Sequence, residues 1–318
     1  METARHIIPD IHGQHGKLEA ALKALGFQHR RGAWRHPFGE TVLFLGDFID
    51  RGPEQRAVLR DVRDMIEAGS ARAVMGNHEL NAVHYHATDP VSGGALRPHN
   101  DKNTAQHAAF LAEFPPGAPD TRAWLDWMGR LPLYLDDGDI RVVHACWDAA
   151  SIAFLVRETG DGRMTPYQVW QAARTQTAFG AAVETVVKGP EHDLPAGYVV
   201  HDKQGTARDR VRIKWWPQAQ EAAPHWRDMA MSVPDPGELP DGPVPADLQA
   251  VIYPGNAKPV FFGHYWMHGK VVRQARNAMC LDYSAGIDGP LVSYRVEPGE
   301  QAVDPDRVRC HGDPHPAV

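Results

Sequence analysis

Cysteines, long apolar runs and an excess of positive charge are scarce or missing in this sequence, and each shortage excludes a class of protein. Only three cysteines occur among 318 residues, and Cys146, Cys280 and Cys310 lie too far apart for a disulfide framework or a zinc motif. No apolar stretch approaches the ~20 residues that a membrane span needs. The N-terminal residues also lack the basic segment, apolar core and cleavage site of a signal peptide. We therefore expect a cytoplasmic protein without membrane contact.

The charge balance argues against one further partner. There are 33 Lys and Arg against 40 Asp and Glu, which gives a net charge of −7. A broad surface for duplex nucleic acid needs clustered positive charge, so we expect no such partner. The apolar share of 43% and the length are sufficient for a sizeable core. Histidine, in contrast, is frequent, with eighteen copies.

Three short apolar stretches near the N-terminus are predicted to be strands. They cover residues 5–9, 41–44 and 71–75, and each is followed by a polar turn. Apolar residues at helical spacing follow the first two turns. This βαβαβ pattern predicts a parallel sheet with right-handed crossovers. Ligands of such sheets bind beyond the carboxyl ends of the strands, so the turn residues are candidate site residues.

Metal-competent side chains occupy the turns of five predicted strands. They are Asp10 with His12, Asp47 with Asp50, Asn77 with His78, then His144 after 140–143, and His264 after 260–262. Singly, each turn has a simpler interpretation, such as helix capping by Asn77. Together, carboxylate, amide and imidazole ligands without thiolates favour Mn²⁺, Fe or Zn²⁺ over a structural zinc site. Because the ligands are too many for one ion, we expect two ions that share a carboxylate, as in two-metal hydrolysis.

The ordered motifs resemble those of calcineurin-like metallophosphoesterases. They read Asp-x-His-Gly at 10–13, Gly-Asp-x-x-Asp-Arg-Gly at 46–52 and Gly-Asn-His-Glu at 76–79, followed by His144 and Gly263-His264. The second and third motifs resemble the phosphoprotein phosphatase branch, which contains bacterial Ser/Thr protein phosphatases and diadenosine tetraphosphatases. The resemblance implies an α/β fold, a four-layer α-β-β-α sandwich with two central mixed sheets and the metals at one sheet edge.

The resemblance also implies two divalent metal ions. Mn²⁺ is the expected metal, and Fe, Zn, Ni, Co and Mg are alternatives. Asp47 would bridge the two ions. The other implied ligands are Asp10 and His12 for the first ion, and Asn77, His144 and His264 for the second.

The roles of the remaining motif residues follow from the same resemblance. Arg51 would bind the phosphate with its planar fork of donors, next to Asn77 and His78. His78 would be the general acid and Asp50 would orient it. A metal-bridged hydroxide would attack phosphorus in line. A second phosphate-binding cation has no clear counterpart, and Lys188, Arg210 and Arg212 are the candidates.

Outside the motifs, we predict a single domain over 1–298 and a loose C-terminal tail over 299–318. Residues 187–250 are interpreted as an insertion whose paired Trp215 and Trp216 could stack a nucleotide. The segment 85–119 is rich in His, Asn, Gly and Pro and is expected to be a solvated loop or partial lid.

Three functions follow from these observations. The first is a binuclear-metal phosphatase for phosphomonoesters such as phosphoprotein. The alternative is a bis(5'-nucleosyl)-tetraphosphatase that acts on dinucleoside polyphosphates. An inactive metal-binding scaffold is the third, and it would predict lost ligands, whereas all six ligand positions are filled. The expected partner is therefore a phosphorylated small molecule, nucleotide or protein.

Overall fold

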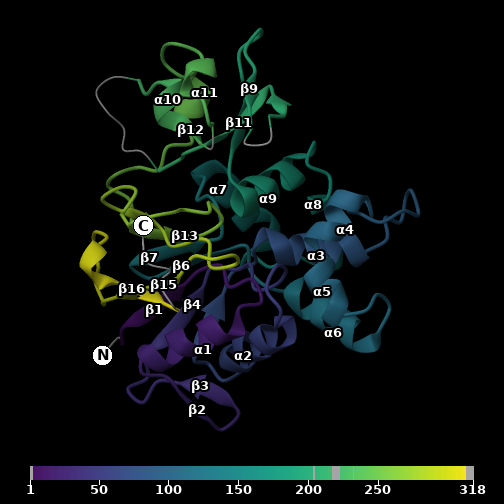
Figure 1. Ribbon diagram of the computed structural model, residues 1–318, viewed down its shortest axis with the longest axis vertical. Helices are drawn as coiled ribbons and strands as arrows, with labels where there is room; N and C mark the ends of the chain where they lie inside the picture. Colours follow the sequence, from purple (N-terminus) through teal and green to yellow (C-terminus); the bar gives the residue numbers. More distant parts are fainter. Residues whose placement is uncertain (1–2, 203–204, 217–222, 232, 313–318) are drawn as a thin grey trace.

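Two mixed β-sheets form the centre of the fold (Figure 1). The computed structural model describes residues 3–202, 205–216, 223–231 and 233–312. The first sheet has the strand order β16 (Val308–His311), β15 (Leu291–Val296), β1 (Arg5–Ile8), β4 (Thr41–Phe44) and β5 (Ala71–Ala73). Strand β4 is parallel to β1 and β5, whereas β15 is antiparallel to β1 and β16. The predicted parallel arrangement of the first three strands is thus confirmed.

The second sheet supplies the later strand ends. Its order is β14 (Ala278–Cys280), β13 (Val260–Phe262), β7 (Ile140–Val143) and β6 (Tyr134–Asp137). Strand β13 is parallel to both of its neighbours, and β6 and β7 form the predicted antiparallel hairpin. The carboxyl ends of β7 and β13 therefore lie at the same edge of this sheet.

The two sheets pack face to face, because alternate side chains of each strand point to opposite sides. Leu43 of β4, Val142 of β7 and Phe261 of β13 belong to one buried cluster between the sheets. Their neighbours Val42 and Phe44 belong instead to the cluster that contains the helices. The inward and outward faces of both sheets are thus buried, which is the condition for a four-layer sandwich.

Helices cover both outer faces, and Figure 1 shows the layers. Those on the side of the first sheet are α1 (His15–Ala24) and α2 (Gln55–Glu67). Those next to the second sheet are α7 (Ala149–Thr159), α8 (Pro166–Ala172) and α9 (Ala178–Lys188). The predicted α-β-β-α sandwich is confirmed. No helix in the described ranges is long and apolar enough to cross a membrane.

A further group of helices flanks the sandwich. They are α3 (Asn77–His86), α4 (Asp101–Gln106), α5 (Ala108–Glu113) and α6 (Pro119–Met128). The segment 85–119 is expected from the sequence to be a solvated loop or partial lid, and the loop prediction is wrong where α4 and α5 form. Phe110 and Phe114 explain the difference, because both are fully buried and fix α5 in the core.

The insertion at 187–250 forms the part of the molecule drawn uppermost in Figure 1. Its elements are β8 (Glu191–Asp193), β9 (Val200–His201), β10 (Ala207–Arg208), β11 (Arg210–Ile213), α10 (Trp226–Met229), β12 (Ala230–Met231), the 3-10 helix η1 (Pro236–Glu238) and α11 (Ala246–Gln249). These elements enclose a small apolar cluster of their own.

The expectation that the paired tryptophans could stack a nucleotide is wrong. Trp215 has no exposed surface, and Trp216 is 6% exposed. Both pack against Phe262, and the indole N–H of Trp215 donates to the carbonyl of Ala145 at 2.9 Å. They therefore anchor the insertion to the second sheet.

The C-terminal segment also differs from its prediction. Within the expected loose tail, η2 (Pro305–Arg307) leads into β16, which pairs with β15. A buried hydrogen bond of 2.7 Å between the Ser293 hydroxyl and Nε2 of His311 connects β15 to β16. Residues 313–318 lie outside the described residues. The sequence pattern also missed the hairpin of β2 (Gln28–Arg30) and β3 (Ala33–Arg35).

Candidate metal centre and active site

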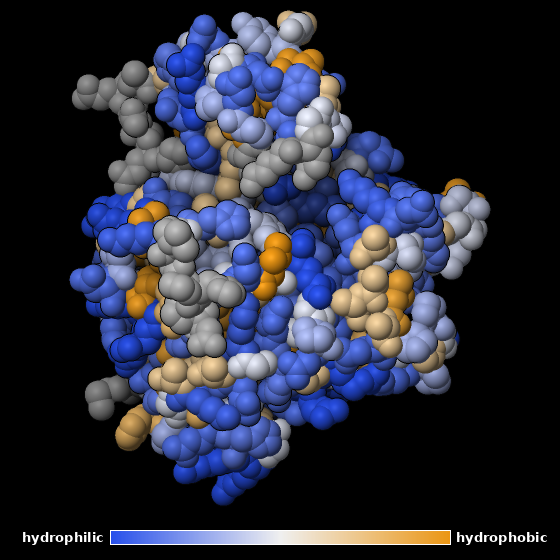
Figure 2. All heavy atoms as spheres, viewed as in Figure 1, coloured by the Kyte–Doolittle hydropathy of each residue, from blue (hydrophilic) through white to orange (hydrophobic). Residues whose placement is uncertain are grey.

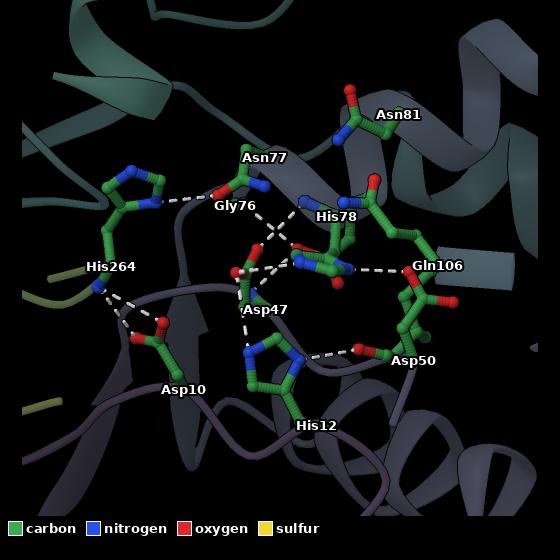
Figure 3. Close-up of polar contacts among 12 residues, drawn as sticks. Asp10, His12, Asp47, Asp50, Gly76, Asn77, His78, Asn81, Gln106 and His264 are labelled. Carbon is green, nitrogen blue, oxygen red and sulfur yellow. Dashed lines mark hydrogen bonds and ion pairs between the residues drawn. The ribbon is translucent and has the colours of Figure 1, made fainter. Parts of the chain in front are cut away.

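The five predicted turns converge on one place at the carboxyl ends of the strands. Figure 3 labels residues of the turns that carry Asp10, Asp47, Asn77 and His264. The turns after β1 and β4 carry Asp10 with His12 and Asp47, the start of α3 carries Asn77, and the turns after β7 and β13 carry His144 and His264. All six side chains are buried. The structure thus brings together the complete set of ligands expected from the sequence.

Two glycines allow these turns to approach one another. A Cβ at Gly76 would lie 2.2 Å from Oδ1 of Asp47, and a Cβ at Gly263 would lie 1.9 Å from Oδ1 of Asp10. Both distances are far below contact, so any side chain would push a carboxylate out of the centre. The glycines of the third and the last strand-end motifs therefore have a packing role that is specific to this site.

Backbone strain is concentrated at the same residues. Five candidate site residues have φ between 49° and 73°, a region that costs non-glycine residues about 1–3 kcal/mol each: His12, Asp47, Asp50, Arg51 and His264. Such conformations persist only where the surrounding structure fixes them. Their clustering marks this edge as functional, independently of the motifs.

Asp47 lies between two groups of possible ligands. Its Oδ2 is 3.7 Å from Nε2 of His12 and 3.5 Å from Nε2 of His144. One group of close ligand atoms contains His12, Asp47 and His78, and the other contains Asp47, His144 and His264. Asp47 is thus the shared member, which is the geometry expected of a bridging carboxylate.

The imidazoles are oriented by their second nitrogens. Nδ1 of His12 donates to the carbonyl of Ile49 at 2.8 Å, and Nδ1 of His144 donates to that of Leu45 at 2.7 Å. Each ring therefore directs its Nε2 towards the centre, which is the orientation of metal-ligating histidines. Nε2 of His12 and Nε2 of His264 are buried without a hydrogen-bond partner. Buried nitrogens without a partner cost free energy, and a bound cation at each would give it a partner.

Negative charge is crowded around these nitrogens. Burial, and next the charge of Asp282, raise the pKa of Asp10 well above its usual range. Burial and then Asp47 raise the pKa of Glu79 to about 7. Glu79 accepts backbone N–H bonds from Asp47 and Phe48, both at 2.8 Å, and so fixes the Asp47 turn. Buried carboxylates that repel one another, together with orphaned imidazole nitrogens, fit a site for divalent cations.

His78 faces the centre with one nitrogen and Asp50 with the other. Its Nδ1 lies 2.5 Å from Oδ2 of Asp50, and its Nε2 lies 3.9 Å from Oδ2 of Asp47. Burial lowers the pKa of His78, but the charges of Asp47 and Asp50 outweigh this effect and raise it. The geometry permits two roles for His78, proton donor and metal ligand.

Arg51 lies at the rim with its guanidinium stacked on an indole. The Cζ atom is 3.8 Å from the ring centroid of Trp266. Within the described part of the chain, no carboxylate is within ion-pair distance of this guanidinium. Asp282 holds the Trp266 turn by accepting its backbone N–H at 2.8 Å. Sequence reasoning missed Trp266 and Asp282, although Trp266 lies only two residues beyond a motif histidine.

The candidates for a second phosphate cation differ in their surroundings. Lys188 is paired with Glu184 on its own helix, and Arg210 is an exposed side chain paired with Asp193. Of the three cations, Arg212 has an electrostatic effect on a candidate ligand. Burial, and after it the charge of Arg212, lower the pKa of His264. Its Nε is buried without a partner. The structure therefore favours Arg212 among the three.

The family follows from the fold, the site and a comparison with family models. The description "Calcineurin-like phosphoesterase" matches residues 6–179, and the chain belongs to this family of metal-dependent phosphoesterases. It is therefore a hydrolase that acts on phosphoesters at a binuclear metal centre.

Individual relatives are similar to different extents. The chain is 26% identical to a symmetrical bis(5'-nucleosyl)-tetraphosphatase of Ralstonia nicotianae, over 96% of this chain and 93% of that protein. It is 31% identical to the asymmetrical bis(5'-nucleosyl)-tetraphosphatase PrpE of Bacillus subtilis, over 50% of this chain and 64% of that protein. A solved mutant of a cold-active protein tyrosine phosphatase shares the fold, with a TM-score of 0.50 at 15% identity over 94% of this chain and 76% of that one.

Proposed function

We propose that this protein hydrolyses dinucleoside polyphosphates at a binuclear metal centre and cleaves a dinucleoside tetraphosphate symmetrically. The observation that carries the substrate class is the similarity to a symmetrical bis(5'-nucleosyl)-tetraphosphatase along almost the whole of both chains. The alignment includes the insertion as well as the motif turns, because it spans 96% of this chain.

The proposed ligands are those that converge in the structure. Asp10 and His12 would hold one ion, Asn77, His144 and His264 the other, and Asp47 both. When bound, two divalent ions supply Lewis-acid polarisation of the phosphate and activation of the attacking water. Mn²⁺ is the proposed metal, and the donor set of carboxylate, amide and imidazole without thiolate suits Mn²⁺ as it suits Fe and Zn²⁺.

Two further side chains act on the substrate in this proposal. Arg51 binds phosphate oxygens with its fork of N–H groups, and the Trp266 ring fixes the plane of that fork. His78 donates a proton from Nε2 to the leaving oxygen, because its Nδ1 is engaged by Asp50. Asn77 holds its side-chain oxygen between His144 and His264, at 3.1 and 2.8 Å.

The insertion would bind the part of the substrate beyond the reacting phosphate. A groove of about 700 Å³ runs along β10 and β11, and Figure 2 shows a hydrophilic hollow between the uppermost part and the helices beside it. In β11, Arg210 and Arg212 lie on one face opposite Asp193 and Glu191 of β8. Arg212 is the loosely held member, 3.7 Å from Glu191, and is thus available to a phosphate chain.

Substrate ranking tests this proposal. Purified protein with Mn²⁺ is given diadenosine tetraphosphate, a nucleoside triphosphate, a phosphopeptide and p-nitrophenyl phosphate, and kcat/KM is compared. We expect the highest value for diadenosine tetraphosphate, with ADP as the sole nucleotide product. ATP and AMP as products would contradict symmetrical cleavage. Preference for the phosphopeptide would favour the phosphomonoesterase alternative, and no turnover with two bound ions would favour the inactive scaffold.

A further inference from the structure

Asp50 has both carboxylate oxygens occupied by imidazoles. Oδ2 lies 2.5 Å from Nδ1 of His78, and Oδ1 lies 2.9 Å from Nδ1 of His107. The carboxylate is buried, and the backbone N–H of Asp50 donates to Gln55 at 2.6 Å. The partner of the proposed proton donor is therefore itself held from the opposite side, by a residue outside the strand-end motifs.

His107 is rigidly placed at the junction of α4 and α5. It is 5% exposed, and its ring stacks on Phe110 with centroids 4.7 Å apart and an interplanar angle of 17°. Its Nε2 is 3.4 Å from Nε2 of His86. A histidine kept only for packing would not need both ring nitrogens to face polar partners.

The acceptor fixes the direction of the bond to Asp50. A carboxylate oxygen can only accept, so Nδ1 of His107 carries the N–H and donates to Asp50. Burial above all lowers the pKa of His86 to about 4, so the ring that faces Nε2 of His107 is neutral at pH 7. This direction leaves the negative charge on Asp50, where His78 needs it.

Hydrogen bonds connect the segment that carries His107 to the elements that carry His78 and Asp50. Arg97 donates to Asn81 of α3 at 3.0 Å and to Gln106 of α4 at 3.1 Å. At the other end of the segment, Glu113 accepts the backbone N–H groups of Gln55 and Arg56 at the start of α2, at 2.5 and 2.9 Å. The chain on either side of His107 is thus tied both to the His78 helix and to the stretch just after Asp50.

We propose that His107 is a positioning residue that holds the Asp50 carboxylate in the orientation from which it aims His78 at the leaving oxygen. This inference rests on the proposed acid role of His78. His107 does not touch the substrate, so its effect is confined to steps that need the proton.

Two substitutions of His107 test the inference. His107→Phe removes the N–H donor and keeps an aromatic ring against Phe110, whereas His107→Asn keeps an amide N–H near the position of Nδ1. Steady-state kinetics are measured with phenyl phosphate and p-nitrophenyl phosphate, which differ in leaving group far more than in shape. Removing such an outer partner costs about 10–100-fold. We expect that loss in kcat for phenyl phosphate with His107→Phe, a loss below about threefold for p-nitrophenyl phosphate, and unchanged KM.

Rescue and a parallel variant separate the outcomes. His107→Asn should recover most of the lost kcat while His107→Phe retains the wild-type metal content. Equal losses on both substrates, or no recovery with Asn, would show that His107 is only structural and overturn the inference. His78→Ala is measured beside them. If it is selective for phenyl phosphate and His107→Phe is not, the inference fails and the acid role stands; if His78→Ala is unselective, both fail.

Discussion

Replacing His78 by alanine separates a proton donor from a metal ligand. The ring has Nδ1 at 2.5 Å from Asp50 and Nε2 facing the Asp47 carboxylate at 3.9 Å. A donor on Nε2 accelerates only departure of an oxygen that needs the proton. General acid catalysis contributes typically ~10²–10⁴ in rate. Because each ~1.4 kcal/mol is tenfold, the variant should lose about 3–5 kcal/mol of transition-state stabilisation for an alkyl or phenyl ester.

The leaving group sets the size of the loss. p-Nitrophenolate leaves without help, so His78→Ala should cost less than about tenfold on p-nitrophenyl phosphate. Diadenosine tetraphosphate should behave similarly, because its leaving group is a phosphate that is weakly basic near neutral pH. The alkyl and phenyl esters should lose two to four orders of magnitude.

The assay combines stopped-time kinetics with elemental analysis of the same samples. Asp50→Asn should show the same selectivity as His78→Ala, but more mildly, since it only orients the ring. Both variants should retain the metal content of the wild-type protein. Loss of an ion from His78→Ala, or equal losses on all esters, would refute the acid role and favour His78 as the third ligand beside His12 and Asp47.

Three further changes test the packing, the electrostatics and the insertion. In Gly263→Ala the new Cβ would overlap the Asp10 carboxylate, so kcat/KM should fall at least ~100-fold and elemental analysis should find less bound metal. Gly16→Ala, in open space on α1, should leave both quantities normal. Burial lowers the pKa of His84 to about 4, so its neutral ring contributes fully to the unfolding free energy above pH 6.5. This contribution should fall by about 3 kcal/mol between pH 6.5 and pH 4 in urea titrations. If the unfolding free energy of His84→Gln fell with pH as steeply as that of the wild type, the prediction would be contradicted. Arg212→Ala should raise KM for diadenosine tetraphosphate about tenfold and leave KM for p-nitrophenyl phosphate unchanged. The exposed Arg227→Ala is the control. An equal rise in KM for both substrates in Arg212→Ala would mean that the insertion does not select substrate.

The strand-end residues were predictable because local patterns fix them. Short apolar runs followed by polar turns placed Asp10, Asp47 and Asn77 at the ends of parallel strands, and parallel strands align their carboxyl ends. The parallel pairing of β7 and β13 then brought His144 and His264 to the same edge, as the motif order implied.

The residues that act through long-range contacts were not predictable. His107 is 57 positions from Asp50 and shows no spacing that relates the two, and only the packing of α5 brings them together. For Trp215 and Trp216 the sequence suggested a functional role that packing excludes. Adjacent tryptophans can form an exposed stacking surface or a buried anchor, and the sequence does not distinguish the two. Strand β16 was missed because it lacks the alternation of a half-buried strand: the consecutive residues Arg309 and Cys310 are both exposed, and His311 alone is buried.

The metal content and turnover of Asp47→Asn test the binuclear centre most directly. Within the described part of the chain, Asp47 is the member common to both groups of close ligand atoms, and it is buried beside His144 and His78. Protein loaded with Mn²⁺ should hold about two ions per chain, and the variant at most one, with kcat/KM lower by more than ~10². The exposed Asp306→Asn should match the wild type. Two retained ions and a normal rate in Asp47→Asn would contradict the account.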